Sequence, residues 1–132
     1  MKALDTSVLL AILHGDRNVR ALLRRLRGVE VATTELNLLE LHCLVGRAPP
    51  RGRSQRREAL ERLRRSLTVL PFDSKAAERA ARRTARDDLK APPPLLLGIL
   101  TTLEANGCDE LITADPRDIA GRWPFRITKL SG

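Results

Sequence analysis

Two aspartates in this 132-residue chain stand where a side chain could do chemistry. Asp5 and Asp115 each follow a short apolar run of strand-like composition. In a parallel α/β sheet, ligands collect outside the carboxyl ends of the strands, so the two aspartates are expected to converge there. Each aspartate also begins a helix or a turn, where its side chain can instead cap free backbone amides. Both interpretations agree with the sequence.

Glu40 is a third candidate, because it interrupts an apolar helical pattern. With Leu36, Leu39 and Cys43 it has the i, i+3, i+4, i+7 spacing of one helix face. Burying an ionised carboxylate is costly unless it is paired or bound to a metal. The pattern therefore predicts either an ion site at Glu40 or a glutamate paired with a buried arginine.

Three carboxylates at one sheet edge suit Mg²⁺ or Mn²⁺, since these hard cations take oxygen ligands and keep part of their water. Such an ion activates water and neutralises a phosphodiester during hydrolysis. Other chemistry has less support. His14 and His42 lack a nucleophile motif and are expected to be surface or packing residues. Cys43 and Cys108 lack metal-site spacing and are expected to be reduced structural thiols.

The elements that must position these groups alternate along the chain. Composition and periodicity predict strands over residues 2–4, 29–32, 68–72, 111–113 and 125–130. Helices are expected over residues 8–13, 17–27, 34–45, 74–90 and 95–105, with a basic helix around Leu60 and Leu63. This alternation predicts a single three-layer α/β/α domain over residues 1–132, with a mostly parallel sheet of four to five strands.

The charge balance is strongly basic. Lys and Arg number 24 against 16 Asp and Glu, a formal net charge of +8, and arginine dominates. Arginine forks bind phosphate or carboxylate, so RNA, DNA or an acidic protein would fit; ion pairing at high temperature is the alternative explanation. The apolar N-terminal stretch is too short and too polar for a membrane span, so we expect a soluble cytoplasmic protein.

Three segments together resemble a known family. LDTSVLL at residues 4–10, TTELNLLEL at residues 33–41 and LITADPRDI at residues 111–119 resemble the PIN domain, specifically the VapC ribonuclease toxins. The order and spacing cover nearly the whole chain. Each motif is weak alone, but an opening Asp-Thr-Ser, a mid-helix glutamate about 35 residues later and a late Thr-x-Asp are jointly fairly specific.

The resemblance implies the function. It implies a metal-dependent endoribonuclease, the toxin of a VapBC-type toxin–antitoxin pair, that uses Mg²⁺ or Mn²⁺ held by Asp5, Glu40 and Asp115. The residues implied to support these ligands are Thr6, Ser7, Thr113 and Asp118. It also implies structured RNA as the substrate, a homodimer, and a small VapB-like antitoxin that blocks the acidic pocket with a basic side chain.

One position departs from the family pattern. The family carries a further metal-binding aspartate at the start of the helix before the last Thr-x-Asp strand, and here that place falls on Pro94 or Pro93. Proline cannot bind a metal, so metal affinity is expected to fall. Asp87 and Asp88 could replace the lost ligand only if the proline segment folds back, and they are more simply solvated residues.

Two alternatives follow from this departure and from the opening aspartate. A catalytically degenerate PIN domain would keep the fold and bind RNA or a protein, and Pro94 favours that alternative. A haloacid-dehalogenase-like phosphatase also begins with an aspartate after its first strand. That family has a second aspartate two residues later, where this chain has Ser7.

Overall fold

A five-stranded parallel sheet forms the centre of the computed structural model, which describes residues 1–86 and 92–130. The strands are β1 (Lys2–Leu4), β2 (Val31–Thr34), β3 (Thr68–Leu70), β4 (Glu110–Thr113) and β5 (Arg126–Lys129). Their order across the sheet is β3-β2-β1-β4-β5, and every neighbouring pair is parallel. β1 is therefore the central strand.

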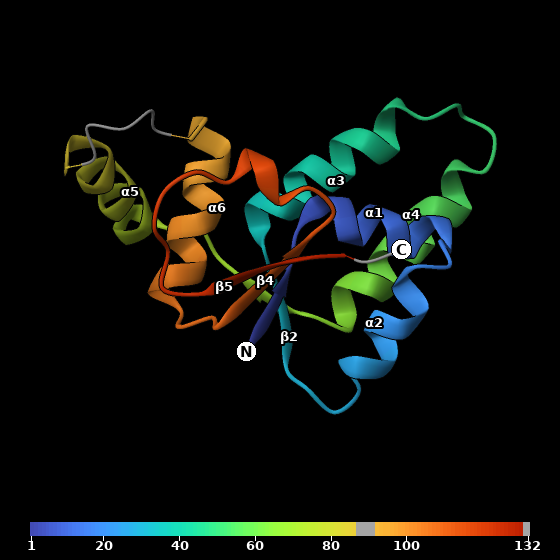
Figure 1. Cartoon of the computed structure of the whole chain (residues 1–132). Helices are drawn as coiled ribbons and strands as arrows, with labels where there is room; N and C mark the ends of the chain where they lie inside the picture. Colours follow the sequence, from blue (N-terminus) through green and yellow to red (C-terminus); the bar gives the residue numbers. More distant parts are fainter. Residues whose placement is uncertain (87–91, 131–132) are drawn as a thin grey trace.

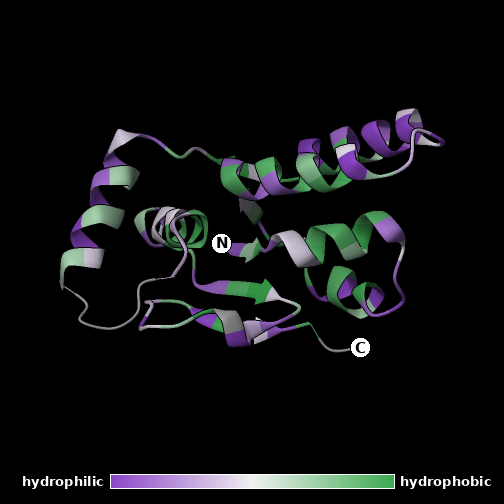
Figure 2. Cartoon of the chain, turned by 90° about the horizontal axis from the view of Figure 1, so that it is seen from above, coloured by the Kyte–Doolittle hydropathy of each residue, from purple (hydrophilic) through white to green (hydrophobic). Residues whose placement is uncertain are grey.

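Helices pack on both faces of this sheet (Figure 1). They are α1 (Thr6–His14), α2 (Val19–Arg25), α3 (Glu35–Arg47), α4 (Arg53–Arg65), α5 (Ser74–Arg86) and α6 (Pro94–Ala105), and a short 3₁₀ helix, η1 (Pro116–Asp118), follows β4. α6 lies between α5 and the sheet (Figure 2). None of the helices in the described part of the chain has the length and apolar composition needed to cross a membrane.

Successive strand residues pack into opposite helix layers. In β1, Ala3 belongs to an aliphatic cluster with α6, whereas Leu4 belongs to a cluster with α1 and α2. Leu111 and Ile112 of β4 divide between the two clusters in the same way. A sheet that is apolar on both faces must be covered on both, as parallel sheets are. The three-layer α/β/α class with a mostly parallel sheet is confirmed.

Local sequence explains how the two helices nearest the site begin. Thr34 caps α3: its hydroxyl accepts a hydrogen bond from the Asn37 backbone N–H, and the Asn37 side chain accepts one from the Thr34 N–H. α6 starts at Pro94, where the missing N–H costs nothing. Gly98 then lets α6 lie close to α3, because a Cβ there would be 2.7 Å from Leu36 Cδ1.

The predicted elements are present with small shifts. Where the ends can be compared within the described residues, they differ by no more than two residues; the predicted end of the helix over 74–90 lies outside them. One packing prediction was wrong. Cys43 is exposed and is therefore no structural thiol, whereas Cys108 is buried.

A buried glutamate at the amino end of β4 was not anticipated from the sequence. Glu110 is 1% exposed, and its Oε1 lies 3.2 Å from Arg25 Nη1 and 3.7 Å from Lys2 Nζ. Thr128 Oγ1 donates a hydrogen bond of 2.5 Å to its Oε2. Burial alone raises the pKa of Glu110, but the Thr128 hydrogen bond and Arg25 outweigh burial and bring that pKa below its ordinary value.

We expect Glu110→Gln to lower the free energy of unfolding by about 1–3 kcal/mol at pH 7, because it leaves several cations around an uncharged amide. A carboxyl whose pKa is lowered by folding stabilises the fold above its unfolded pKa, and that contribution is lost as pH falls through the folded pKa. The difference between parent and variant in urea unfolding should therefore shrink between pH 7 and pH 3. Exposed Glu61, which makes no ion pair within the described residues, gives the control Glu61→Gln, expected to change stability by less than about 0.5 kcal/mol. A variant as stable as the parent at pH 7 would contradict the assigned network.

Candidate functional site

The site lies where the direction of the sheet reverses. From β1 the chain builds outward to β2 and β3, then crosses back to place β4 on the other side of β1. Ligands of open α/β sheets bind at the carboxyl ends of the strands beside such a switch point. A pocket of about 640 Å³ is found there, and Asp5, Glu40 and Asp115 all line it. The remaining lining residues are Thr6, Ser7, Leu10, Leu44, Pro93, Leu95, Leu96, Ile99 and Ile119.

Asp5 is held by two side chains from other elements. It occupies the cap position of α1, but its side chain makes no capping hydrogen bond, so the capping interpretation was wrong for this residue. Instead Asn37 Nδ2 donates to Oδ1 at 3.1 Å and Thr113 Oγ1 donates to Oδ2 at 2.9 Å. Each carboxylate oxygen has more than one lone pair, so both can still accept from a ligand.

Glu40 lies at the edge of the buried face of α3, and the predicted apolar stripe around it was wrong. Leu39 is 53% exposed and Cys43 is also exposed. The residues of α3 that are buried are Asn37, Leu38, Leu41 and Val45. Glu40 has no arginine partner within the described residues; its Oε1 accepts a 2.8 Å hydrogen bond from Thr6 Oγ1. The carboxylate is half-buried because the edge of the helix forms a wall of the pocket.

Asn37 is the residue that sequence reasoning missed. It is 1% exposed, and its Nδ2 donates to Thr6 Oγ1 at 3.0 Å as well as to Asp5. Its Oδ1 accepts from Thr34 Oγ1 at 2.8 Å. One amide thus joins the start of α3 to the start of α1. The available signal was the three-residue spacing from Thr34, which is that of a capping box, together with a position one turn before Glu40.

The remaining predicted hydroxyls, those of Ser7 and Thr113, link α1 to the end of β4. Ser7 Oγ accepts a 3.0 Å hydrogen bond from the Ala114 N–H and lies 3.4 Å from Thr113 Oγ1. Thr113 therefore stands between Ser7 and Asp5, so the hydroxyls fix the position of the Asp5 carboxylate relative to β4. Of the other predicted residues, the Asp118 side chain, Asp87 and Asp88 lie outside what the structure describes.

Asp115 is engaged by its neighbour Arg117. Arg117 Nε donates to Oδ1 at 2.9 Å and Nη2 donates to Oδ2 at 3.0 Å. The Arg117 backbone N–H also donates to Oδ1 at 3.1 Å, so Asp115 caps η1 and the capping interpretation is confirmed for it. These hydrogen bonds from Arg117 lower the pKa of Asp115 to about 2. Any cation that binds Asp115 competes with this guanidinium.

The α6 side of the pocket is apolar. Pro93 immediately precedes the helix and lines the pocket together with Leu95, Leu96 and Ile99. Among the described residues, α6 and Pro93 therefore contribute no oxygen ligand through a side chain. The donors of the pocket come instead from β1, α1, α3 and the segment after β4.

The donor chemistry fits a hard divalent cation, since the pocket offers carboxylates and hydroxyls but neither thiols nor imidazoles. In the residues that the structure describes, no group of three or more His, Cys, Asp or Glu side chains is arranged to hold a metal ion. Asp5 and Glu40 are connected through Thr6 and Asn37, whereas Asp115 is paired with Arg117. A site with three carboxylates therefore requires Asp115 to leave Arg117.

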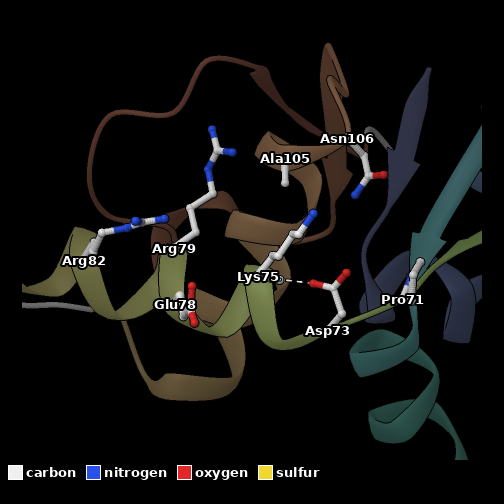
Figure 3. Close-up of a pocket in the computed structure, with 9 residues that line it drawn as sticks. Pro71, Asp73, Lys75, Glu78, Arg79, Arg82, Ala105 and Asn106 are labelled. Atoms are coloured by element: carbon white, nitrogen blue, oxygen red, sulfur yellow. Dashed lines mark hydrogen bonds between the residues drawn. The ribbon is translucent and has the colours of Figure 1, made fainter.

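A second pocket, of about 400 Å³, lies between α5 and the carboxyl end of α6 (Figure 3). Its charged lining residues have both signs: Asp73, Glu78, Lys75, Arg79 and Arg82. The Asp73 carboxylate accepts a hydrogen bond from the Ala76 N–H in the first turn of α5. Arg79 pairs with Glu104 at 3.0 Å. These groups are explained by helix capping and by the packing of α5 on α6, so the first pocket is the better candidate.

The chain is similar to known proteins over nearly its whole length. A family model described as the PIN domain matches residues 2–117. No curated protein sequence matches. Among solved structures, DNA-bound VapBC from Salmonella typhimurium is similar with a TM-score of 0.78 and 20% identity, over 98% of each chain.

Two structures from Mycobacterium tuberculosis are also similar. VapBC-5, a member of the VapBC family of toxin–antitoxin systems, has a TM-score of 0.61 and 26% identity over 97% of each chain. VapC20, described as a sarcin-ricin loop cleaving toxin, has a TM-score of 0.61 and 19% identity over 84% of this chain and 87% of that chain. Similarity at under 25% identity establishes the fold alone.

Replacing the bridging amide should destabilise the fold. We expect Asn37→Ala to lower the free energy of unfolding by about 2–3 kcal/mol, because buried donors and acceptors on Thr34 and Thr6 lose their partner. The matched control is Asn18→Ala, since the Asn18 side-chain oxygen is buried without a partner in the described residues. That control should change stability by about 0.5 kcal/mol or less. Equal losses for the two variants in urea unfolding would refute the bridging role.

Removing the guanidinium should release Asp115. We expect the pKa of Asp115 to rise from about 2 toward its ordinary value in Arg117→Ala, as followed by NMR of the carboxyl carbon. Arg122→Ala, which removes an exposed arginine nearby in sequence, serves as the control and should leave that pKa unchanged. An unaltered pKa in Arg117→Ala would mean that the pair does not persist in solution.

Proposed function

The chain belongs to the PIN domain family, and on that premise we propose that it is a metal-dependent endoribonuclease, the toxin of a VapBC-type toxin–antitoxin pair, with a weakened site. The family match over residues 2–117 supports this proposal, as does a fold similar to VapBC structures over nearly the whole chain. In this proposal residues 1–132 act as one domain. A haloacid-dehalogenase-like phosphatase has no support in the comparisons.

The observation that carries the proposal is the orientation of Asp5. An aspartate at the start of a helix gains a local hydrogen bond by capping it. Asp5 forgoes that bond, and side chains from α3 and β4 hold its carboxylate at the pocket that Glu40 also lines. Orienting groups of this kind hold ligating carboxylates in metal sites.

We assign the metal ligands on this basis. Asp5 and Glu40 would hold Mg²⁺ or Mn²⁺, and Asp115 would join them once Arg117 is displaced. A divalent cation bound there supplies Lewis acidity for hydrolysis of a phosphodiester. Asn37 and Thr113 orient Asp5, while Thr6 orients Glu40. Apolar side chains of α1, α3 and α6 line the rest of the pocket beside these carboxylates.

The site is weakened in two ways. The α6 wall offers Pro93 and aliphatic side chains where the family places an aspartate, and Asp115 is already paired with Arg117. Fewer carboxylate ligands mean lower affinity for a divalent cation. We therefore expect slow cleavage that needs a high metal concentration.

The proposed substrate is RNA, and the proposed partner is a small VapB-like antitoxin. VapC20 is described as cleaving the sarcin-ricin loop, and the VapBC structures are named as toxin–antitoxin systems. By the same analogy we propose a homodimer that acts in the cytoplasm. An antitoxin could place a basic side chain against Asp5 and Glu40, since their carboxylates line an open pocket.

A second candidate function is a catalytically degenerate PIN domain that binds RNA or a protein. Two observations favour it: the absence of an oxygen ligand from the described part of α6, and the pairing of Asp115 with Arg117. Both candidates keep the same fold and the same pocket. They differ in whether the remaining carboxylates bind a metal tightly enough to act.

The test compares cleavage of a broad RNA panel with Mn²⁺ by the parent, Asp5→Asn, Pro93→Asp and Pro94→Asp. We expect slow cleavage by the parent and a loss of at least about 100-fold in Asp5→Asn, because a ligand charge is removed. One of the proline variants should gain on the order of 10-fold in rate and in Mn²⁺ affinity, since a carboxylate is added. An acidic residue is also favourable at a helix amino end, so α6 should still form.

Each result separates the candidates. Cleavage by a proline variant but not by the parent would establish the degenerate domain. If no variant cleaves and isothermal titration finds no Mn²⁺ binding, the nuclease assignment is wrong. Circular dichroism of each variant serves as the control for folding.

A further inference from the structure

The positive charge of the chain is concentrated in two short segments. Residues 51–65 carry seven arginines and two glutamates, a net charge of +5. Residues 17–27, in and around α2, carry five arginines and no acidic residue, which is also +5. The first of these segments consists of the end of the loop after α3 and the whole of α4. Both segments attract polyanions, and α4 is the one that packs against α3, a wall of the pocket.

Five arginines of this segment are exposed, and we call them the α4 arginine surface. They are Arg51, Arg57, Arg62, Arg64 and Arg65. Two glutamates, Glu58 and Glu61, share the surface and line a shallow groove with Arg57, Arg62 and Arg65. The groove is thus mainly, but not wholly, basic.

The α4 arginine surface makes no ion pair with any carboxylate that the structure describes. Elsewhere in the described chain, Arg25 pairs with Glu110, Arg83 with Glu104 and Arg117 with Asp115. Within the same described residues, no member of the α4 arginine surface has a carboxylate partner in salt-bridge contact. Arg65 Nε donates a hydrogen bond of 3.4 Å to the backbone oxygen of Glu61. Their guanidinium groups remain available to an external anion.

The fold does not need these arginines to hold α4 in place. Leu60 is 1% exposed, and Leu63 packs on the same aliphatic cluster as α1 and α3. This apolar stripe attaches the helix to the domain. Arginines that lie close together on the exposed side of a helix weakly destabilise it through like-charge repulsion. Because these arginines make no contact that the fold needs, their number on one helix indicates a polyanionic ligand.

The surface is connected to the pocket by α3. Leu44 of α3 lines the pocket beside Glu40, and α4 packs against both α3 and α1 (Figure 1). The 13 residues of α3 span roughly 20 Å. The 13 residues of α4 add roughly another 20 Å, and Arg62 and Arg65 lie in the last turn of that helix. An RNA bound at the pocket must therefore extend along α3 and then along α4 to contact the whole surface.

We propose that the α4 arginine surface binds the phosphate backbone of the RNA whose scissile segment enters the pocket of Asp5 and Glu40. This inference rests on the proposed function. Arginine forks bind phosphate oxygens bidentately, and the counterions released from the backbone add affinity without reading sequence. RNA suits the surface better than an acidic protein because phosphates recur along the strand at each nucleotide and need only regularly placed cations. The surface positions RNA and takes no part in the chemistry.

The experiment measures binding apart from cleavage. A fluorescein-labelled single-stranded RNA with 2′-O-methyl sugars resists hydrolysis, and EDTA removes divalent metal. Fluorescence anisotropy with the full chain is compared for the parent, for the triple variant Arg57→Gln, Arg62→Gln, Arg65→Gln, and for a matched triple variant of α2 and its end, Arg20→Gln, Arg24→Gln, Arg27→Gln. All six arginines are exposed, and both triple variants lose the same charge.

The α4 triple variant should bind RNA at least about 10-fold more weakly at physiological salt, and the slope of log K against log salt should fall by about 2, at about 0.7 for each lost phosphate contact. The α2 triple variant should bind nearly as the parent does. The quadruple variant Arg57→Glu, Arg62→Glu, Arg64→Glu, Arg65→Glu should no longer bind the RNA, while its circular dichroism spectrum stays that of the parent. In an active enzyme, the α4 triple variant should raise KM and leave kcat unaltered.

Three results would overturn the inference: unchanged binding in the α4 triple variant, an equal loss in the α2 triple variant, or displacement of the RNA by polyglutamate at equal charge. The last of these would indicate an acidic protein as the ligand. If the α4 triple variant alone loses RNA binding and no form of the protein cleaves RNA, the docking surface stands and the nuclease assignment fails. If the parent cleaves RNA and the α4 triple variant binds RNA as the parent does, the nuclease assignment stands and the docking surface fails.

Discussion

The arrangement of the pocket depends on one buried amide. Asn37 contacts the cap of its own helix through Thr34, and it donates to both Asp5 and Thr6 at the start of α1. A buried amide is costly unless its donors and acceptor are satisfied, so these contacts must form together. They fix α1 relative to α3, and thereby fix the separation of Asp5 and Glu40. The sheet provides the location, but this amide sets the geometry.

Acidic residues at the two ends of the sheet are treated differently. At the amino end Glu110 is buried, pairs with Lys2 and Arg25, and accepts a hydrogen bond from Thr128. These contacts within the fold neutralise its charge. At the carboxyl end Asp5 and Glu40 receive hydrogen bonds only from neutral side chains in the described residues. Their charge is oriented but not neutralised. Asp115 lies between these cases, because Arg117 neutralises it from an exposed position that a ligand could displace.

The basic residues show a similar division. Arginines beside β4 and α6 pair with buried or half-buried glutamates and contribute to packing. Those of the α4 arginine surface face solvent on a helix that an apolar stripe already holds. The acidic pocket and the basic surface are thus separate features, connected by α3. This separation matters because a cation in the pocket and a polyanion on α4 do not compete for the same side chains.

The sequence by itself determined the fold class, the order of elements and the positions of Asp5 and Asp115 after β1 and β4, because strand and helix periodicity is local and the parallel sheet follows from their alternation. Thr34 and Pro94 begin α3 and α6 through local signals that act within one turn. The sequence pattern misjudged the face of α3, where Leu39 and Cys43 are exposed, because periodicity does not show which side of a helix another element will cover. Only the tertiary structure decided that Asp5 turns away from capping, that Asn37 bridges two helices and that Glu110 is buried among cations. Each of those contacts joins residues far apart in the chain, and their hydrogen bonds exist only once the sheet has brought them together.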